Sequence, residues 1–158
     1  MIYVLGFLIS FAVVYLLIPP LARLAFRLDF VDKPREGVER KLHREPIPLT
    51  ASYAIYLGFA AAYLLLTEWS GYETLAVLAG GALLLVIGTV DDWYKTQGRD
   101  FPSLPKALVQ MAAAVLVYLS GIEFSGFVNP FNGDYVLLPE WMQFVLTILW
   151  IFGVTTVI

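Results

Sequence analysis

The sequence predicts an all-α, multi-pass transmembrane helical bundle, with residues 1–158 forming a single membrane domain of about five spans. Of its 158 residues, 59% are hydrophobic, and the mean hydropathy is +0.76. Soluble domains usually contain about 45–50% apolar residues, so this excess indicates a chain suited to lipid. The apolar residues also gather in runs close to the length that crosses a bilayer.

Five such runs follow one another along the chain. The first covers residues 2–18 and is expected to end at Pro19, because proline cannot continue the hydrogen-bond ladder of a helix. The others cover residues 51–67, 75–90, 104–121 and 141–158. The middle three are rich in Ala and Gly, which let helices approach closely in lipid, so we expect them to pack against one another.

The basic residues are confined to two of the four connections. Seven of the ten Lys and Arg residues lie in or beside residues 21–50, and the other three in or beside residues 91–104. Since Lys and Arg collect on the cytoplasmic side, we expect both loops on the cytoplasmic side of a bacterial plasma membrane and the N-terminus on the outer side. The net charge of −3 argues against nucleic-acid partners, and the absence of cysteine excludes disulfides and thiolate metal sites in this sequence.

Two adjacent carboxylates, Asp91 and Asp92, follow the third apolar run directly. At a helix C-terminus they would oppose the helix dipole, which favours cations there. A divalent cation would offset this, and Mg²⁺ is usually held by one or two carboxylates together with substrate phosphates. The alternative is a solvated helix end, where Lys95 pairs with either aspartate at helical spacing.

Both basic loops carry groups suited to a diphosphate. The first contains Lys41, the single histidine His43 and the rigid stretch at residues 46–48, and the second contains Lys95 and leads to Lys106. Cations suit a polyanion, and carboxylates suit a metal that bridges it. The alternatives are a basic loop that binds anionic lipid headgroups and a histidine that is merely exposed.

Two sequence elements resemble the polytopic polyprenyl-phosphate N-acetylhexosamine-1-phosphate transferases of glycosyl transferase family 4. They are "RKLHREPIP" at residues 40–48 and "DDWYK" at residues 91–95, the latter followed by "LPKALVQ" at residues 104–110. The resemblance covers essentially the whole chain and corresponds to the N-terminal half of a member. The N-acetylglucosamine or teichoic-acid branch is more similar than the muramoyl-pentapeptide branch.

This resemblance implies transfer of N-acetylhexosamine 1-phosphate, by branch GlcNAc 1-phosphate, from a UDP-sugar to undecaprenyl or another polyprenyl phosphate. It implies that Asp91 and Asp92 form the catalytic site and bind Mg²⁺, or alternatively Mn²⁺. Lys95 and Lys106 would position phosphate groups, and Lys41 and His43 would belong to the substrate-binding loop. The product would initiate a lipid-linked envelope polysaccharide such as peptidoglycan or teichoic acid.

Other interpretations stay open beside the enzymatic one. The chain stops where the family continues into a second aspartate motif, which is expected of a fragment, a truncated product or a degenerate paralogue. An inactive membrane protein that binds lipid phosphate, or associates with another copy or a homologue, is therefore the alternative. A transporter or channel would place ionisable residues inside the spans, and the five apolar cores contain none.

Overall fold

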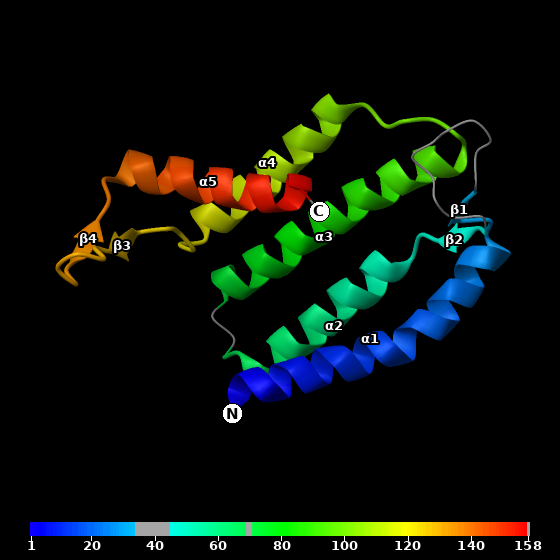
Figure 1. Cartoon of the computed structure of the whole chain (residues 1–158), viewed down its shortest axis with the longest axis horizontal. Coiled ribbons are helices and arrows are strands. Elements are labelled where there is room, and N and C mark those ends of the chain that lie inside the picture. Colours follow the sequence, from blue (N-terminus) through cyan, green and yellow to red (C-terminus); the bar gives the residue numbers. More distant parts are fainter. Residues whose placement is uncertain (34–44, 69–70, 158) are drawn as a thin grey trace. The chain divides into compact units, whose positions relative to one another are not determined.

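The computed structural model of the chain describes residues 1–33, 45–68 and 71–157. These residues form five helices and two antiparallel two-stranded sheets (Figure 1). The helices are α1 (Ile2–Arg27), α2 (Ala51–Leu66), α3 (Tyr72–Thr96), α4 (Ser103–Leu119) and α5 (Glu140–Val157). The strands are β1 (Val31–Asp32), β2 (Ile47–Pro48), β3 (Gly126–Val128) and β4 (Tyr135–Leu137). The prediction of an all-α membrane bundle is confirmed, and the two short hairpins are additions to it.

The five apolar runs correspond one to one with the five helices. Helices α1 and α3, with 26 and 25 residues, are long and apolar enough to cross a bilayer. Helices α2, α4 and α5 are also apolar and have 16, 17 and 18 residues. Large apolar side chains are mostly exposed, whereas the buried hydrophobic residues are mainly small ones, Ala25, Ala54, Ala62, Ala76, Ala113 and Ala114. Small residues inside and large ones outside are typical of helices packed in lipid.

Helix α1 does not end where the sequence predicted. It continues through Pro19 and Pro20 to Arg27 as one curved ribbon (Figure 1). The two prolines have no N–H, so the ladder bonds to the carbonyls of residues 15 and 16 cannot form, and such a gap bends a helix. Membrane helices tolerate such prolines. The loop predicted over residues 21–50 therefore begins only after Arg27.

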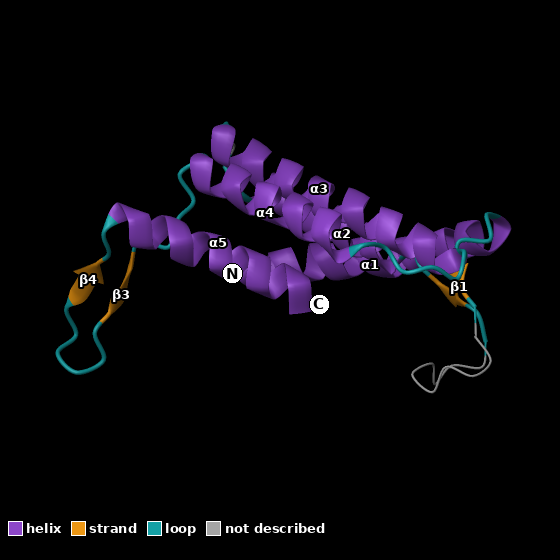
Figure 2. Ribbon diagram, turned by 90° about the horizontal axis from the view of Figure 1, so that it is seen from above, coloured by secondary structure: helices purple, strands orange, loops and turns teal. Residues whose placement is uncertain are grey.

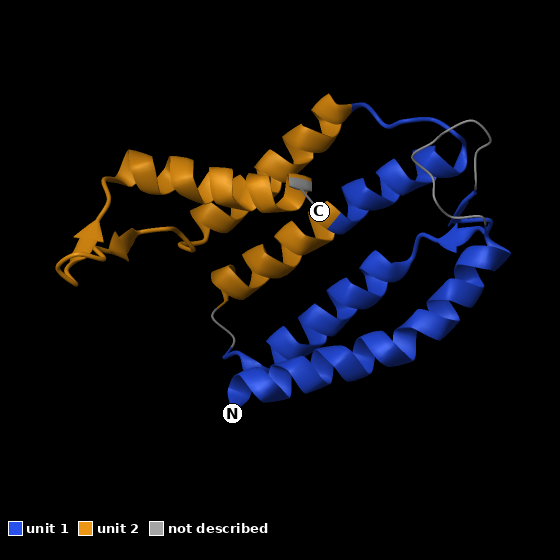
Figure 3. Cartoon of the chain, in the orientation of Figure 1, with its two compact units in different colours: residues 1–69, 85–102 blue, residues 70–84, 103–158 orange. Residues whose placement is uncertain are grey.

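The chain divides into two compact units, coloured separately in Figure 3. Unit 1 comprises Met1–Trp69 and Leu85–Pro102, and unit 2 comprises Ser70–Leu84 and Ser103–Ile158. Helix α3 contributes its C-terminal part to unit 1 and its N-terminal part to unit 2. The two units are described separately below.

In unit 1, α1 and α2 approach closely where Gly58 faces Ser10. The Ser10 hydroxyl donates to the Gly58 carbonyl over 3.1 Å. A Cβ atom at position 58 would lie only 2.8 Å from Cγ2 of Val14 and 3.0 Å from the Ser10 carbonyl oxygen. Glycine is therefore what permits this helix crossing. The close partner of α2 in unit 1 is thus α1, and the expected packing of the three Ala- and Gly-rich helices against one another stays a prediction.

A two-residue ladder closes the end of unit 1 that carries the first basic loop. Val31 pairs with Pro48 and Asp32 with Ile47, so both ends of the connection between α1 and α2 lie together. Helix α1 leads into this ladder through Asp29, whose φ of 54° lies in the left-handed region. Aspartate tolerates this conformation better than most residues.

In unit 2, α4 and α5 are joined by polar side chains as well as by apolar packing. The buried Gln110 donates from Nε2 to the Thr155 carbonyl over 2.9 Å. The rings of Tyr118 and Phe144 meet edge to face, with centroids 5.0 Å apart. The connection between these helices carries the β3–β4 hairpin, in which Gly126 pairs with Leu137.

Candidate functional site

The paired aspartates lie inside helix α3 and not at its end, which corrects the predicted loop over residues 91–104. The helix continues to Thr96, and Lys95 occupies its last turn. Gly98 (φ 76°) then donates to the Lys95 carbonyl, and Arg99 donates to the Tyr94 carbonyl, each over 3.0 Å. This pair of bonds is a Schellman cap, which satisfies carbonyls at the helix end. The cap and the basic Lys95 therefore already stabilise the negative end of the helix dipole, without a metal ion.

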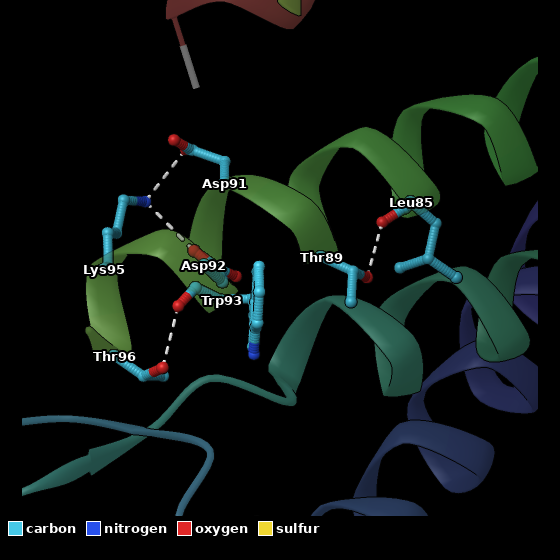
Figure 4. Close-up of polar contacts among 7 residues, drawn as sticks. All are labelled: Leu85, Thr89, Asp91, Asp92, Trp93, Lys95 and Thr96. Atoms are coloured by element: carbon cyan, nitrogen blue, oxygen red, sulfur yellow. Dashed lines mark hydrogen bonds and ion pairs between the residues drawn. The ribbon is translucent and has the colours of Figure 1, made fainter. Parts of the chain in front are cut away.

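Lys95 bridges the two carboxylates (Figure 4). Its ammonium nitrogen lies 3.0 Å from Oδ2 of Asp91 and 3.0 Å from Oδ1 of Asp92. The aspartate side chains are only 14% and 21% exposed, whereas the Lys95 side chain is 42% exposed. Two negative charges thus share one positive charge in a partly desolvated cluster.

The ammonium of Lys95 stays charged in this setting. The group lies beyond the apolar segment of residues 75–90, in the polar last turn of α3. Burial alone would lower its pKa, but the hydrogen bonds and charges of Asp92 and Asp91 outweigh burial and leave the pKa above its ordinary value. The cluster therefore keeps one unit of excess negative charge when both aspartates are ionised.

The donor set of this cluster fits a hard divalent cation. Within the described ranges, no third His, Cys, Asp or Glu joins the two aspartates to make a group of three or more. Mg²⁺ suits such a sparse site, because it usually keeps waters and takes the rest of its ligands from substrate phosphates. Carboxylate oxygens also suit Mn²⁺. A metal ion would have to share or displace the ammonium of Lys95, so its presence stays a prediction.

Just before the aspartates, α3 carries the hydroxyl of Thr89, which meets the hydroxyl of Tyr53 on α2. Thr89 donates to the Leu85 carbonyl over 2.7 Å (Figure 4). Its oxygen also lies 2.6 Å from the hydroxyl of Tyr53. Since Thr89 has one proton, Tyr53 is the donor in that second bond. The sequence offered little sign of this pair, because Tyr53 and Thr89 belong to different apolar runs.

These two residues also border an apolar pocket of about 320 Å³ in unit 1. The pocket lies among the ends of α1, α2 and α3, and its other lining residues are Leu21, Leu24, Ala25, Leu28, Phe30 and Thr50. Among the described residues, no charged side chain lines it. It is the part of unit 1 beside the aspartates that could receive a hydrocarbon group.

The remaining predicted site residues are placed differently. Lys41 and His43 lie outside the described residues, so their predicted role is untested. Lys106 lies in the first turn of α4 in unit 2, whereas the aspartates and Lys95 belong to unit 1. Convergence of Lys106 with the carboxylates therefore stays a prediction, whereas Asp91, Asp92 and Lys95 are brought together in unit 1.

Comparison with known proteins supplies an independent finding. A family model described as glycosyl transferase family 4 matches residues 74–158. The chain is 29% identical over 155 residues to a probable undecaprenyl-phosphate N-acetylglucosaminyl 1-phosphate transferase of Bacillus subtilis, covering 98% of this chain and 41% of the relative. It is 33% identical over 134 residues to a decaprenyl-phosphate N-acetylglucosaminephosphotransferase of Mycolicibacterium smegmatis, covering 79% of this chain and 31% of the relative. No solved structure matches significantly.

Two facts about the extent of these matches bear on the site. The chain spans about a third to two fifths of the length of these relatives. The family match includes Asp91, Asp92, Lys95 and Lys106, whereas Lys41 and His43 precede it.

Proposed function

Because the chain belongs to glycosyl transferase family 4, we propose that the protein containing it transfers GlcNAc 1-phosphate from UDP-GlcNAc to undecaprenyl or another polyprenyl phosphate. The cluster of Asp91, Asp92 and Lys95 carries the proposal, since it lies within the matched region and combines carboxylates for a metal with a cation for phosphate. The printed names of the relatives support the choice of sugar and of lipid. The product would start a lipid-linked envelope polysaccharide.

The reaction is a phosphoryl transfer at the β-phosphorus of the nucleotide sugar. An oxygen of the lipid phosphate forms a bond to that phosphorus, and the bond from it to the bridging oxygen breaks, so UMP leaves. Several negative charges must come together, and catalysis of this kind consists largely of positioning and charge stabilisation. Mg²⁺, when bound, would supply positive charge to the diphosphate oxygens.

The residues of the cluster would have different roles in this reaction. Asp91 and Asp92 would hold the cation through carboxylate oxygens, while the helix fixes their spacing. Lys95 holds both carboxylates in place before the cation arrives. A divalent cation and an ammonium repel each other between the same carboxylates. We therefore expect Lys95 to turn from the aspartates towards a substrate phosphate, where its charge again has a partner.

The protein is an integral membrane protein, and we place its site on the cytoplasmic face of a bacterial plasma membrane. Figures 1 and 2 show the end of α1 and the C-terminal end of α3 at the same end of unit 1. Basic residues mark both ends, Arg27 on α1 and Lys95 on α3. That distribution is typical of cytoplasmic ends.

An impermeant thiol reagent tests this placement in intact cells. A single cysteine at Asp100, in the loop after α3, should be shielded, and one at Tyr72, where α3 begins, should be labelled. Labelling of Asp100→Cys from outside would contradict the proposed orientation.

The assay of function uses the full-length protein in detergent with UDP-GlcNAc, polyprenyl phosphate and Mg²⁺. Release of UMP together with a polyprenyl-diphosphate-linked sugar is the expected result. A full-length protein that binds polyprenyl phosphate without turnover would instead support the inactive membrane-binding alternative.

A further inference from the structure

The connection between α4 and α5 exposes an unusual amount of apolar surface. It contains the β3–β4 hairpin, and Phe131 at its tip is 97% exposed. Cross-strand pairing places Phe127 with Val136 on one face and Val128 with Tyr135 on the other, so neither face of the hairpin is polar. The other exposed apolar residues of the connection are Phe124 and Leu137. An isolated two-stranded hairpin of this composition is poorly suited to water.

Several polar groups at the tip of the hairpin are hydrogen-bonded within the tip itself. The backbone N–H of Phe131 donates to Oδ1 of Asn129 over 2.9 Å, and that of Asp134 donates to Oδ1 of Asn132 over 3.1 Å. The Asn132 amide also donates to the Asp134 carboxylate over 2.7 Å. Backbone bonds between Asn129 and Asp134 and between Gly133 and Asn129 close the turn. These internal bonds reduce the cost of placing the tip where water is scarce.

The start of the connection runs alongside the first turns of α5. The N–H of Phe124 donates to the hydroxyl of Thr147 over 2.8 Å. Thr147 is 5% exposed and lies seven residues after Glu140, where α5 begins. At 1.5 Å per residue, this contact is about 10 Å along the helix from its start. The chain therefore turns towards the hairpin beside the second turn of α5, and not beyond the end of that helix.

A second buried side chain of α5 supports the end of the connection. The amide of Gln143, 7% exposed, donates to the Leu138 carbonyl over 2.6 Å. The Leu138 N–H donates in turn to the Ser125 carbonyl over 2.9 Å. Irregular backbone at membrane depth occurs only where other protein groups satisfy it, and here two side chains of the apolar helix α5 do so.

From these contacts we propose that the β3–β4 hairpin lies in the interfacial layer of the bilayer, with its aromatic and aliphatic side chains against lipid. Only two residues separate β4 from α5, so the hairpin cannot move more than about 10 Å from the helix end. Figures 1 and 2 both show the hairpin turning aside from the axis of α5 instead of continuing it. A hairpin in that position continues the lipid-facing surface of α4 and α5, and aromatic residues favour this layer.

Spin labels in the full-length protein, made cysteine-free and reconstituted in liposomes, test the proposal. A label at Phe131→Cys should collide more with oxygen, which partitions into lipid, than with a water-soluble nickel chelate. Leu108→Cys, on an exposed apolar position of α4, provides the lipid reference, and Asp100→Cys provides the aqueous one. Phe127→Cys is a second reporter should the tip variant fold poorly.

Each outcome decides the matter. Oxygen collisions at residue 131 like those at residue 108 support lipid contact. Strong collisions with the nickel chelate, like those at residue 100, would show that the hairpin stands in water. Weak collisions with both reagents would show that another part of the protein or a second copy covers it, and either of these last two results overturns the proposal. None of them depends on the proposed enzymatic activity.

Discussion

The two units place polar groups in contrasting ways. At the end of α3 in unit 1, two carboxylates and an ammonium lie partly exposed and share ionic contacts of 3.0 Å. In unit 2, Gln110, Gln143 and Thr147 are uncharged and buried, and each is hydrogen-bonded to backbone carbonyl groups. The first arrangement can exchange its partners at little cost, because water replaces a lost contact. The second is fixed, since a lost partner would leave a buried polar group unsatisfied.

This contrast separates residues that act on a substrate from residues that hold the fold. Substitutions in the cluster on α3 should change activity and leave folding intact. Substitutions of the buried polar residues of α5 and α4 should weaken folding first.

The largest effect is expected at the paired aspartates of the full-length protein. Asp91→Asn and Asp92→Asn should each lower turnover by about 10²–10³, the loss typical of removing one electrostatic group from a comparable site. UMP release measures the effect, and membrane extraction with an unchanged elution profile shows that folding is intact. Asp100→Asn, an exposed aspartate in the loop after α3, is the matched control. Near-normal turnover of both variants would support the alternative interpretation, in which the two aspartates are only a solvated part of the helix.

Removal of the ammonium should have opposite effects on two ligands. Lys95→Met should bind Mn²⁺ several-fold more tightly, because two ion pairs that compete with the metal, each worth on the order of 0.2–1 kcal/mol, are gone. The same variant should bind UDP-GlcNAc more weakly if Lys95 reaches phosphate. Electron paramagnetic resonance of free Mn²⁺ and calorimetry with the nucleotide sugar measure the two affinities.

The control for this experiment is Lys33→Met. The Lys33 ammonium lies 2.6 Å from the carboxylate of the exposed Asp29, and both residues are far from Asp91 and Asp92 in the sequence. It should leave both affinities unchanged. Weaker Mn²⁺ binding by Lys95→Met would show that Lys95 supports the metal site and does not compete with it.

A fold effect of intermediate size is expected at Thr147. Thr147→Val removes the acceptor of the Phe124 N–H, and a buried unsatisfied donor costs about 1–3 kcal/mol. Reversible unfolding in mixed detergent measures the free energy of unfolding. Thr147→Ser keeps the hydroxyl and should stay within a few tenths of a kcal/mol of the parent, on the order of a neutral change. A loss for Thr147→Ser without a loss for Thr147→Val would mean that the methyl group, not the hydrogen bond, is what stabilises this position.

The smallest effect is expected at Gln110. Gln110→Leu removes the bond to the Thr155 carbonyl, and interhelical hydrogen bonds in membranes average about 0.6 kcal/mol, with a maximum near 1.7. The same unfolding measurement applies, with the exposed Gln97→Leu as the control. A loss far above this range would indicate that Gln110 fixes the register of α4 against α5.

The helices were largely predictable, because long apolar runs have few alternative structures in lipid. Their ends were not. Proline suggested a stop at residue 19, yet the membrane tolerates the gap in the ladder, and the charged residues after Val90 continued the helix through i→i+4 pairing. The β3–β4 hairpin went unpredicted, although Asn132-Gly133 is a known hairpin turn signal.

The candidate site was predictable only where it is local in sequence. Helical spacing alone anticipated that Lys95 could reach Asp91 or Asp92, and the structure shows that it reaches both. The contact between Tyr53 and Thr89 joins positions 36 residues apart, and no local pattern signals it. Contacts of that kind depend on how α2 packs against α3, which composition does not specify.

The close crossing of α1 and α2 limits which substitutions this sequence can accept during evolution. A Cβ atom at position 58 would press on both a side chain and a backbone oxygen of α1, so an alanine there must be accompanied by another change. Among homologues, a residue larger than glycine at 58 should occur together with a residue smaller than valine at 14. If the two positions vary independently, the helices must separate by a few tenths of an ångström, and the Ser10 hydroxyl would then lengthen its bond to the carbonyl of residue 58. Correlated substitutions at positions 14 and 58 would therefore be evidence for this packing that comes from sequences alone.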